Sequence, residues 1–419
     1  VIDRLAPLAL SPPAYAAWWQ GIEAQAPGPV RIDAIEVAGL RRVNPRALER
    51  FIDIQAGDTP SAGDIDRNLL RIFGDGGYES VDYSLLGSEG RNILRIVPVE
   101  KPWGPDYLRF GIKLAADNVD GASFGLRAAY HQTWLNALGG ELLYHAELGS
   151  TNRLGVNYLQ PLDPTQRYFG ELLTGVSQER LSVFEDDKRI AKYKITESRL
   201  GAWLGYNAHV YGTLRLGWLQ RRQDYRLDTG TLALPRGETS FGGWQATLDF
   251  DRFDRMYFPT RGWSSHVSYF HAAGRDYSRL DADLRGAFSI ADNIFNARFA
   301  YIGSPRGRLP ANDAGRLGGF LNMTAYSAGQ LLGDDIRYAG LRSERIIGRL
   351  PLGLRGDMRL GVAVEAARLG RRFSERDRDG WLDSLAVYLG GETPLGRAYL
   401  GLAHSRQGVS NLFLFIGTP

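Results

Sequence analysis

Residues 121–125 read GASFG, which matches the G-x-S-x-G turn that presents a catalytic serine in many lipases and esterases. That turn needs a buried apolar strand before the serine and a helix after it. Here the polar segment ADNVD precedes Gly121, and FGLRAAYHQTW follows with apolar residues at every second position. Because this alternation predicts a strand, we expect Ser123 to be a structural serine and not a nucleophile.

The sequence offers few other groups for catalysis. Asp75 lies in a DGG segment that mimics the aspartate motif of patatins, but it precedes Ser123, whereas the patatin aspartate follows its serine. The six histidines show no H-E-x-x-H or other metal-site spacing, and the absence of cysteine removes thiol catalysis and disulfides. We predict no catalytic residue, no cofactor, no metal site and no enzymatic activity for this chain.

The amino-acid composition excludes several classes of protein. Apolar residues make up 44% of the 419 residues, but they never run together for the ~18 residues that a transmembrane helix requires. Fifty basic and 47 acidic residues give a net charge of +3, so we expect no nucleic-acid partner. The 51 glycines and 11% aromatic residues are typical of a large antiparallel β protein with many tight turns.

The pattern along the chain predicts three parts. Residues 1–29 form an apolar, aromatic stretch that ends in a Pro/Gly linker, and we interpret them as a linker or the remnant of a missing upstream passenger domain. Residues 30–102 predict the order β-α-α-β-β, in which Asn44 and Ser61 cap the two helices. Phe73 is expected on the buried face of the second helix.

Residues 103–419 predict a transmembrane β-barrel. About sixteen segments of roughly ten residues alternate apolar and polar positions, as the strands of outer-membrane barrels do. The fold class is therefore mainly β, with the β-α-α-β-β domain followed by a 16-stranded antiparallel barrel. The expected strand starts are Tyr107, Ala122, Leu138, Asn152, Arg167, Ile190, Val210, Ser240, Arg261, Asp276, Asn293, Asp335, Gly356, Asp383, Leu395 and Asn411.

The polar face of each strand is expected to line the lumen. In the strand from Asp276, Leu280 and Leu284 fall on one face, and the charged residues on the other face are candidate lumen-lining groups. A soluble sandwich would also alternate. A barrel is favoured by the charges of both signs, by the even strand count, and by linkers that alternate roughly between short and long, with the short ones on one rim. The charged residues are Arg279, Asp281, Asp283 and Arg285.

Residues 30–102 resemble a POTRA domain. The resemblance rests on the order of elements, on the GDGGYESVDYSL joint at residues 74–85, and on the EKPWGP exit at residues 100–105. POTRA domains lie in the periplasm in front of outer-membrane barrels and add partner strands to their sheet edges. The resemblance therefore implies a barrel in the bacterial outer membrane.

The barrel resembles the BamA/TpsB superfamily of outer-membrane insertases and translocators. DFDRFDRMYFPTRGW, at residues 249–263, is similar to its periplasmic turn motif, with site residues Asp249, Asp251, Pro259 and Gly262. RLGGFLNMTAYSAGQLLGD, within residues 304–334, resembles the sixth extracellular loop, whose R-G-F or R-G-Y tip folds into the lumen. Gly318 and Gly319 match the two glycines of that loop, and Tyr326 matches its aromatic residue. The candidate loop motif consists of Gly318, Gly319, Met323, Thr324, Ala325 and Tyr326.

The family loop is anchored by its arginine on an acidic residue of a lumen-facing strand. Thr324 and Ala325 depart from the R-G pair, and threonine cannot make a charge-assisted contact. The acid position resembles Glu365, which has the lumen phase alongside Arg359. The resemblance therefore implies a lumen loop whose strongest anchor is changed.

DGWLDSLAVYLGGETPLGRAYLGLAHS, at residues 379–405, is similar to the closing pair of strands of the superfamily. Such barrels usually end on an aromatic residue, so the stop at Pro419 suggests a lost terminal residue. The last strand has only NLFLFIG to pair with the first, which predicts a short seam where the barrel opens.

Within the superfamily, a single POTRA domain without a long plug helix is most like the translocator of a patatin-type autotransporter. That resemblance implies a patatin-like lipid acyl hydrolase upstream of this chain. It implies as partners outer-membrane lipid, the unfolded passenger of the same polypeptide, periplasmic chaperones and the barrel assembly machinery. The alternatives are an insertase, a two-partner secretion transporter, a porin-like channel, or a membrane-embedded hydrolase. The sequence does not give the oligomeric state.

Overall fold

The computed structural model describes residues 10–24, 30–104, 106–231, 233–350 and 356–417. The expected linker at residues 1–29 lies partly outside them, in residues 1–9 and 25–29. The chain divides into two compact units, residues 1–102 and 103–419. Each unit is described by itself.

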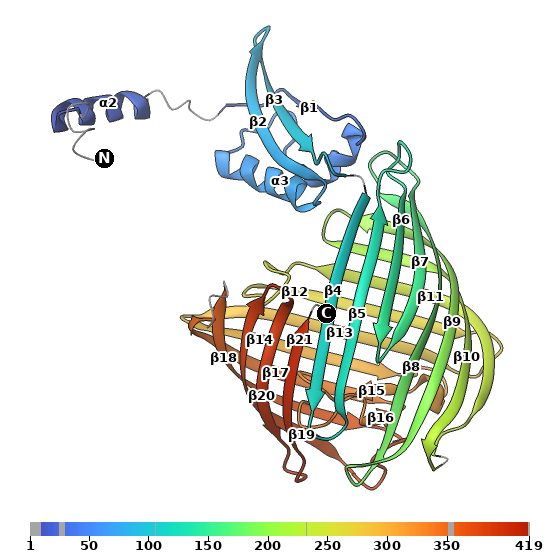
Figure 1. The fold of residues 1–419 in the computed structure, drawn as a ribbon. Helices are drawn as coiled ribbons and strands as arrows, with labels where there is room; N and C mark the ends of the chain where they lie inside the picture. The colour runs from blue at the N-terminus through green and yellow to red at the C-terminus, as the bar shows by residue number, and fades with distance from the viewer. Residues whose placement is uncertain (1–9, 25–29, 105, 232, 351–355, 418–419) are drawn as a thin grey trace. The chain divides into compact units, whose positions relative to one another are not determined.

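Within the N-terminal unit, residues 30–102 form a three-stranded sheet with two helices (Figure 1). Strand β3 (Arg91–Glu100) lies in the middle, parallel to β1 (Ala34–Val37) and antiparallel to β2 (Tyr78–Ser88). One long edge of the sheet, on β2, therefore has no strand partner within the described residues. Between β1 and β2 lie η2 (Pro45–Phe51) and α3 (Ala62–Gly74).

The first of the two predicted helices is a 3₁₀ helix and not an α-helix. Asn44 caps η2 by accepting from the Arg46 amide, and short helices commonly take this tighter form. Ser61 and Asp64 form a capping box at the start of α3, as its sequence indicates. Phe73 is exposed, contrary to expectation, because Ile72 occupies the buried position in that turn.

Glu100 fixes the loop that follows β1. Its Oε1 accepts hydrogen bonds from the backbone amides of Arg41, Arg42 and Val43 at 3.1, 2.9 and 2.9 Å. Burial opposes ionisation of this carboxyl, but the amides of Val43, Arg42 and Arg41 outweigh burial and hold the pKa of Glu100 below its ordinary value. The last residue of β3 thus stabilises the start of the unit.

Helix α2 (Pro12–Ala24) was not predicted from the sequence. Tyr15, Trp18 and Trp19 form an exposed aromatic cluster on it, with ring centroids 5.7 to 6.3 Å apart. No helix in the described part of the chain is both long and apolar enough to span a bilayer.

The second unit is a closed antiparallel barrel of sixteen strands, which confirms the predicted barrel (Figure 1). Every strand starts within three residues of the expected position. The strands are β4 (Asp106–Asp117), β5 (Gly121–Gln132), β6 (Glu141–Gly149), β7 (Asn152–Pro161), β8 (Tyr168–Glu185), β9 (Lys188–Ala208), β10 (Gly212–Gly230), β11 (Gly237–Asp251), β12 (Gly262–Ala272), β13 (Ser278–Ile290), β14 (Asn293–Gly303), β17 (Ile336–Arg349), β18 (Asp357–Leu369), β19 (Trp381–Thr393), β20 (Gly396–His404) and β21 (Ser410–Gly417).

The alternation of each strand sorts its side chains between the outside and the lumen. On β18, Val362 and Val364 are exposed on the outer face, whereas Ala363 and Glu365 are buried on the inner face. The outer face is rich in exposed Leu, Val, Phe and Trp side chains on most strands. Monomeric soluble proteins rarely expose contiguous apolar surface of this kind.

We call the end where β4 begins and β21 ends the terminal rim, and the opposite end the loop rim. The two rims do not divide into short and long linkers as the sequence suggests. Strands β8, β9 and β10 remain paired for 18 to 21 residues and extend the barrel on the loop-rim side. The β8–β9 linker at the loop rim is therefore only residues 186–187.

The barrel closes through its shortest strand pairing. Strand β21 pairs with β4 over five residues, from Phe413↔Asp117 to Gly417↔Lys113. Strand β4 pairs with β5 over twelve. Strand β21 thus ends partway along β4 (Figure 1), and residues 106–112 of β4 have no partner strand on that side among the described residues.

Candidate functional site

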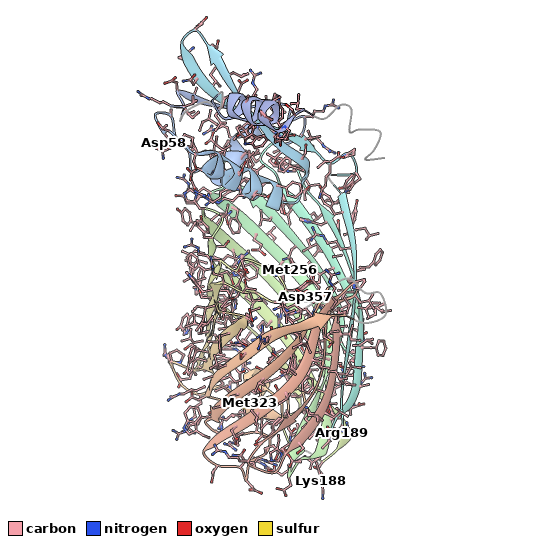
Figure 2. All side chains as sticks on the ribbon, turned by 90° about the vertical axis from the view of Figure 1, so that its left-hand side faces the viewer. Asp58, Lys188, Arg189, Met256, Met323 and Asp357 are labelled. Carbon is pink, nitrogen blue, oxygen red and sulfur yellow. The ribbon has the colours of Figure 1, made fainter. Side chains whose placement is uncertain are left out.

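The long loop between β14 and β17, residues 304–335, enters the lumen from the loop rim. Its stem is a short hairpin of β15 (Gly315–Leu317) and β16 (Leu331–Gly333), paired from Gly315↔Gly333 to Leu317↔Leu331. Met323 lies inside the barrel, between the levels of Asp357 and Lys188 (Figure 2). Residues 323–327 are all completely buried, so the loop occludes the lumen.

The tip of this loop, Met323–Tyr326, is closed by backbone hydrogen bonds around two glycines. The Gly318 amide donates to the Asn322 carbonyl at 2.7 Å, and the Gly319 amide donates to the Tyr326 carbonyl at 2.7 Å. Both glycines have positive φ angles, +119° and +91°. This conformation favours glycine, which gives the Gly-Gly pair a structural role.

Glu365, on β18, is the acceptor for the loop tip. Its Oε1 accepts from the Met323 amide at 2.9 Å, and its Oε2 accepts from the Thr324 amide at 2.7 Å. The hydroxyls of Tyr338 and Ser384 donate to the same carboxylate at 2.8 and 2.9 Å. Two backbone amides and two hydroxyls thus surround a carboxylate that is 2% exposed.

The anchor therefore uses backbone amides at the position where the sequence resemblance implied an arginine side chain. A threonine side chain is short, so the backbone of Thr324 can approach Glu365 directly. The Thr324 hydroxyl is engaged elsewhere, accepting from the Leu321 amide at 2.9 Å. The expectation from the missing arginine considered side chains alone and does not account for the hydrogen bonds of these two backbone amides.

The loop is hydrogen-bonded to both strands of the β4–β21 seam, through its tip and through the residue that follows the tip. Asn411, on β21, donates from Nδ2 to the Thr324 carbonyl at 2.9 Å. Ser327, next to the tip, donates from Oγ to Asp117 of β4 at 2.8 Å. Asp117 itself pairs with Phe413 at the end of the seam. The occluding loop and the seam are therefore held by shared contacts.

A second anchor holds the loop to the opposite wall. Asp313 accepts from Arg221 Nη1 at 2.7 Å and from the Tyr277 hydroxyl at 2.9 Å. Arg221 also donates to Glu197 of β9 at 2.8 Å, and Tyr225 donates to the Asn312 carbonyl. Asp313 was not predicted from the sequence, because a single acid in a long loop carries no spacing signal.

The charged row predicted for the lumen forms local pairs. Arg279 contacts Asp281 at 2.7 Å, and Asp283 contacts Arg285 at 2.7 Å. Asp283 also pairs with Arg298 at 2.8 Å, and Arg298 donates to the Leu321 carbonyl of the loop. Arg279 further donates to the Asp313 carbonyl. The row therefore contacts the loop directly at Asp313 and indirectly at Leu321, through Arg298.

Arg359, which was expected in the lumen alongside Glu365, pairs with a different acid. Its Nη1 lies 3.8 Å from Glu344 Oε2, and its guanidinium lies over the ring of Phe258, 4.7 Å from the centroid. Phe258 belongs to the turn between β11 and β12, and it packs in one buried cluster with Met323 and Tyr399. The turn thus reaches into the lumen from the terminal rim, which the sequence analysis did not predict.

The four residues of the predicted turn motif have separate roles. Asp249 contacts Arg215 at 2.9 Å and His266 at 2.5 Å on the lumen wall. Asp251 accepts from the Phe253 amide at 3.0 Å. Pro259 lies in the linker, and Gly262 opens β12 with a φ of +109° at which a Cβ would collide with the Arg252 carbonyl.

The lumen also contains a cavity, and Ser123 has no catalytic partner among the described residues. A cavity of about 500 Å³ is bounded by Asp249, His266, Asp283 and Arg285 near the terminal rim. Ser123 lies within the continuous strand β5, and its hydroxyl donates to the Ala115 carbonyl. The strand predicted for GASFG is confirmed. The arrangement is that of a plugged, charged channel.

The two glycines allow a matched test of the loop. In Gly318→Ala, the new Cβ would collide with the Ser327 carbonyl, in addition to the strain of about 1–3 kcal/mol that a positive φ imposes. In Gly319→Ala, the new Cβ meets Ala328 at an ordinary 3.5 Å, so only the φ strain remains. We expect trypsin to cleave at Arg316 faster in Gly318→Ala than in Gly319→Ala, measured on the folded full chain. Equal rates in the two variants would contradict the docked tip.

Solved structures with this fold include two kinds of outer-membrane protein. BamA from Haemophilus ducreyi, lacking POTRA domains 1–3, has a TM-score of 0.63 at 14% identity, covering 94% of this chain and 85% of that chain. CdiB from Acinetobacter baumannii has a TM-score of 0.60 at 13% identity, covering 93% and 74%. CdiB from Escherichia coli has a TM-score of 0.57 at 12% identity, covering 93% and 77%. At these identities the likeness concerns the fold.

No protein-family model matches the chain, and no curated protein matches it.

Proposed function

We propose that this chain is an outer-membrane protein that moves polypeptide across or into the membrane. The apolar outer face of the barrel suits a bilayer, and the paired charges inside suit a hydrated lumen. The fold is that of BamA and CdiB. The terminal rim then faces the periplasm and the loop rim faces the outside.

One observation carries the proposal: the occluding loop is hydrogen-bonded to both strands of the shortest pairing in the barrel. Thr324 is bonded to β21 through Asn411, and Ser327 to β4 through Asp117. A passive diffusion pore does not need a strand seam that is hydrogen-bonded to its occluding loop. A transporter needs both, because a chain can pass only when the plug moves or the wall parts.

In this proposal the N-terminal unit acts as a POTRA domain in the periplasm. Its β2 edge has eleven residues and no partner strand among those described, so an extended segment could add to it by strand pairing. The finer proposal, from the resemblance of a single such domain to patatin-type autotransporters, is that the segment belongs to an upstream patatin-like passenger. Chaperones and the barrel assembly machinery would then act before insertion.

The masses of the native gene product test the finer proposal. We expect an outer-membrane species much heavier than 46.5 kDa, or a second fragment of the same product in the medium. A product of 46.5 kDa would remove the passenger and leave an insertase or a two-partner transporter. Large, steady channels from the purified chain in planar bilayers would instead favour a porin.

A further inference from the structure

A row of four side chains crosses the outer face of the barrel near the loop rim. The strand registers place Tyr301 of β14 opposite Arg337 of β17, Arg337 opposite Arg368 of β18, and Arg368 opposite Trp381 of β19. Arg337 and Arg368 are exposed and share the outward phase of their strands. Two arginines therefore face each other between two aromatic residues.

Two like charges directly opposite each other destabilise a strand pair. Arg337 is partly balanced by Asp335, with Nη2 3.2 Å from Oδ2. Arg368 makes no ion pair or hydrogen bond through its side chain within the described part of the chain. The fold thus maintains an uncompensated cation on its outer face, which an external anion would stabilise.

The arginine pair borders a cavity of about 640 Å³ at the turn between β18 and β19. Two aspartates also line this cavity, and Arg371 and Arg376 are paired with Asp334 and Glu185 at 3.7 and 2.8 Å. Arg368 and Arg372 are the lining arginines without an ion pair among the described residues. Arg372 donates from Nη2 to the Gly380 carbonyl at 3.0 Å, while its Nη1 is buried with no hydrogen-bond partner among the described residues. The arginines lining the cavity are Arg337, Arg368, Arg371, Arg372 and Arg376.

We propose that this cavity binds the phosphorylated headgroup of a glycolipid in the outer leaflet. The inference rests on the proposed outer-membrane location. Arginine forks match phosphate oxygens in a bidentate manner, and the exposed guanidinium of Arg368 has donors to offer. A lipid is favoured over a soluble anion because Arg337 and Arg368 point outward, where acyl chains would lie below them. Tyr301 and Trp381 flank the two arginines, and tyrosine and tryptophan are typical of the membrane interface.

Native mass spectrometry of the detergent-purified full chain tests the site with bisphosphorylated lipid A as the probe. We expect Arg368→Gln/Arg372→Gln to bind lipid A about tenfold or more weakly, because charge-assisted hydrogen bonds are lost. The matched control is Arg222→Gln/Arg226→Gln on β10, where two exposed arginines are already paired with Glu238 and Asp224 at 2.5 and 2.7 Å. The control is expected to bind lipid A as the unaltered chain does.

Four results would overturn the proposal: unchanged binding in the double variant, an equal loss in the control, equal binding of dephosphorylated lipid A, or displacement of lipid A by millimolar inorganic phosphate. Resistance to SDS at room temperature checks that each barrel is folded, and Arg368→Gln alone serves if the double variant is not. The assay requires no transport. Loss of export with lipid binding intact would therefore count against the proposed function and not against this site.

Discussion

Glu365→Ala should turn the occluded barrel into a conducting one. The substitution leaves the Met323 and Thr324 amides of the loop without their acceptor. The Tyr338 and Ser384 hydroxyls lose the same acceptor, but they belong to the barrel wall and do not distinguish the docked loop from the released one. Each stranded amide costs about 1–3 kcal/mol, so the docked loop tip should lose at least ~2 kcal/mol. That loss corresponds to about 30-fold in the ratio of docked to released loop. The strand ladder of the barrel is unaffected, so the chain should still fold.

Single-channel recording of the purified full chain in planar bilayers measures this effect. The unaltered chain is expected to show small, erratic openings, and Glu365→Ala large and sustained ones. Glu147→Ala is the matched control, because Glu147 lines the lumen wall with Arg127 and Arg153 and does not touch the loop. If Glu147→Ala conducts as strongly as Glu365→Ala, the lost charge and not the lost anchor explains the current.

The barrel could be predicted because the alternation of apolar and polar residues is visible within each strand of the sequence. Alternation with a period of two assigns each residue to one face, and the sixteen strands follow from it without any knowledge of partners. Glu365 could likewise be placed in the lumen by phase and by the resemblance. The prediction that Phe73 is buried was wrong for a local reason as well, because Ile72 already occupies the buried position in that turn of the helix.

The way the loop is held could not be read from the sequence. Side-chain reasoning at Thr324 considers only the hydroxyl, whereas the contact to Glu365 comes from its backbone amide, which every residue except proline possesses. Asp313 and Phe258 reach their partners across the lumen, from segments far apart in the chain. Such contacts depend on the closed shape of the barrel and leave no periodic signal.

Locking the seam should stop polypeptide export while leaving the barrel intact. Ala116 of β4 and Leu414 of β21 are register partners on the outer face. The chain has no cysteine, so Ala116→Cys/Leu414→Cys would form a single defined disulfide. Five paired residues at about 0.5–1.5 kcal/mol per hydrogen bond make a seam that a passing chain could part. A covalent bond would remove that possibility.

The readout is the amount of polypeptide that the full gene product delivers to the cell surface. Under oxidising conditions we expect the seam variant to deliver at least about tenfold less polypeptide than the unaltered chain, because the disulfide holds the two strands at a fixed distance. A reductant should restore delivery. Ala128→Cys/Ala146→Cys is the matched control, because it links β5 to β6 at register partners within a hairpin. Undiminished delivery with the seam disulfide formed would place the path through the lumen alone. In that case Glu365, and not the seam, would be the element that controls passage, and releasing the loop tip would be sufficient for transport.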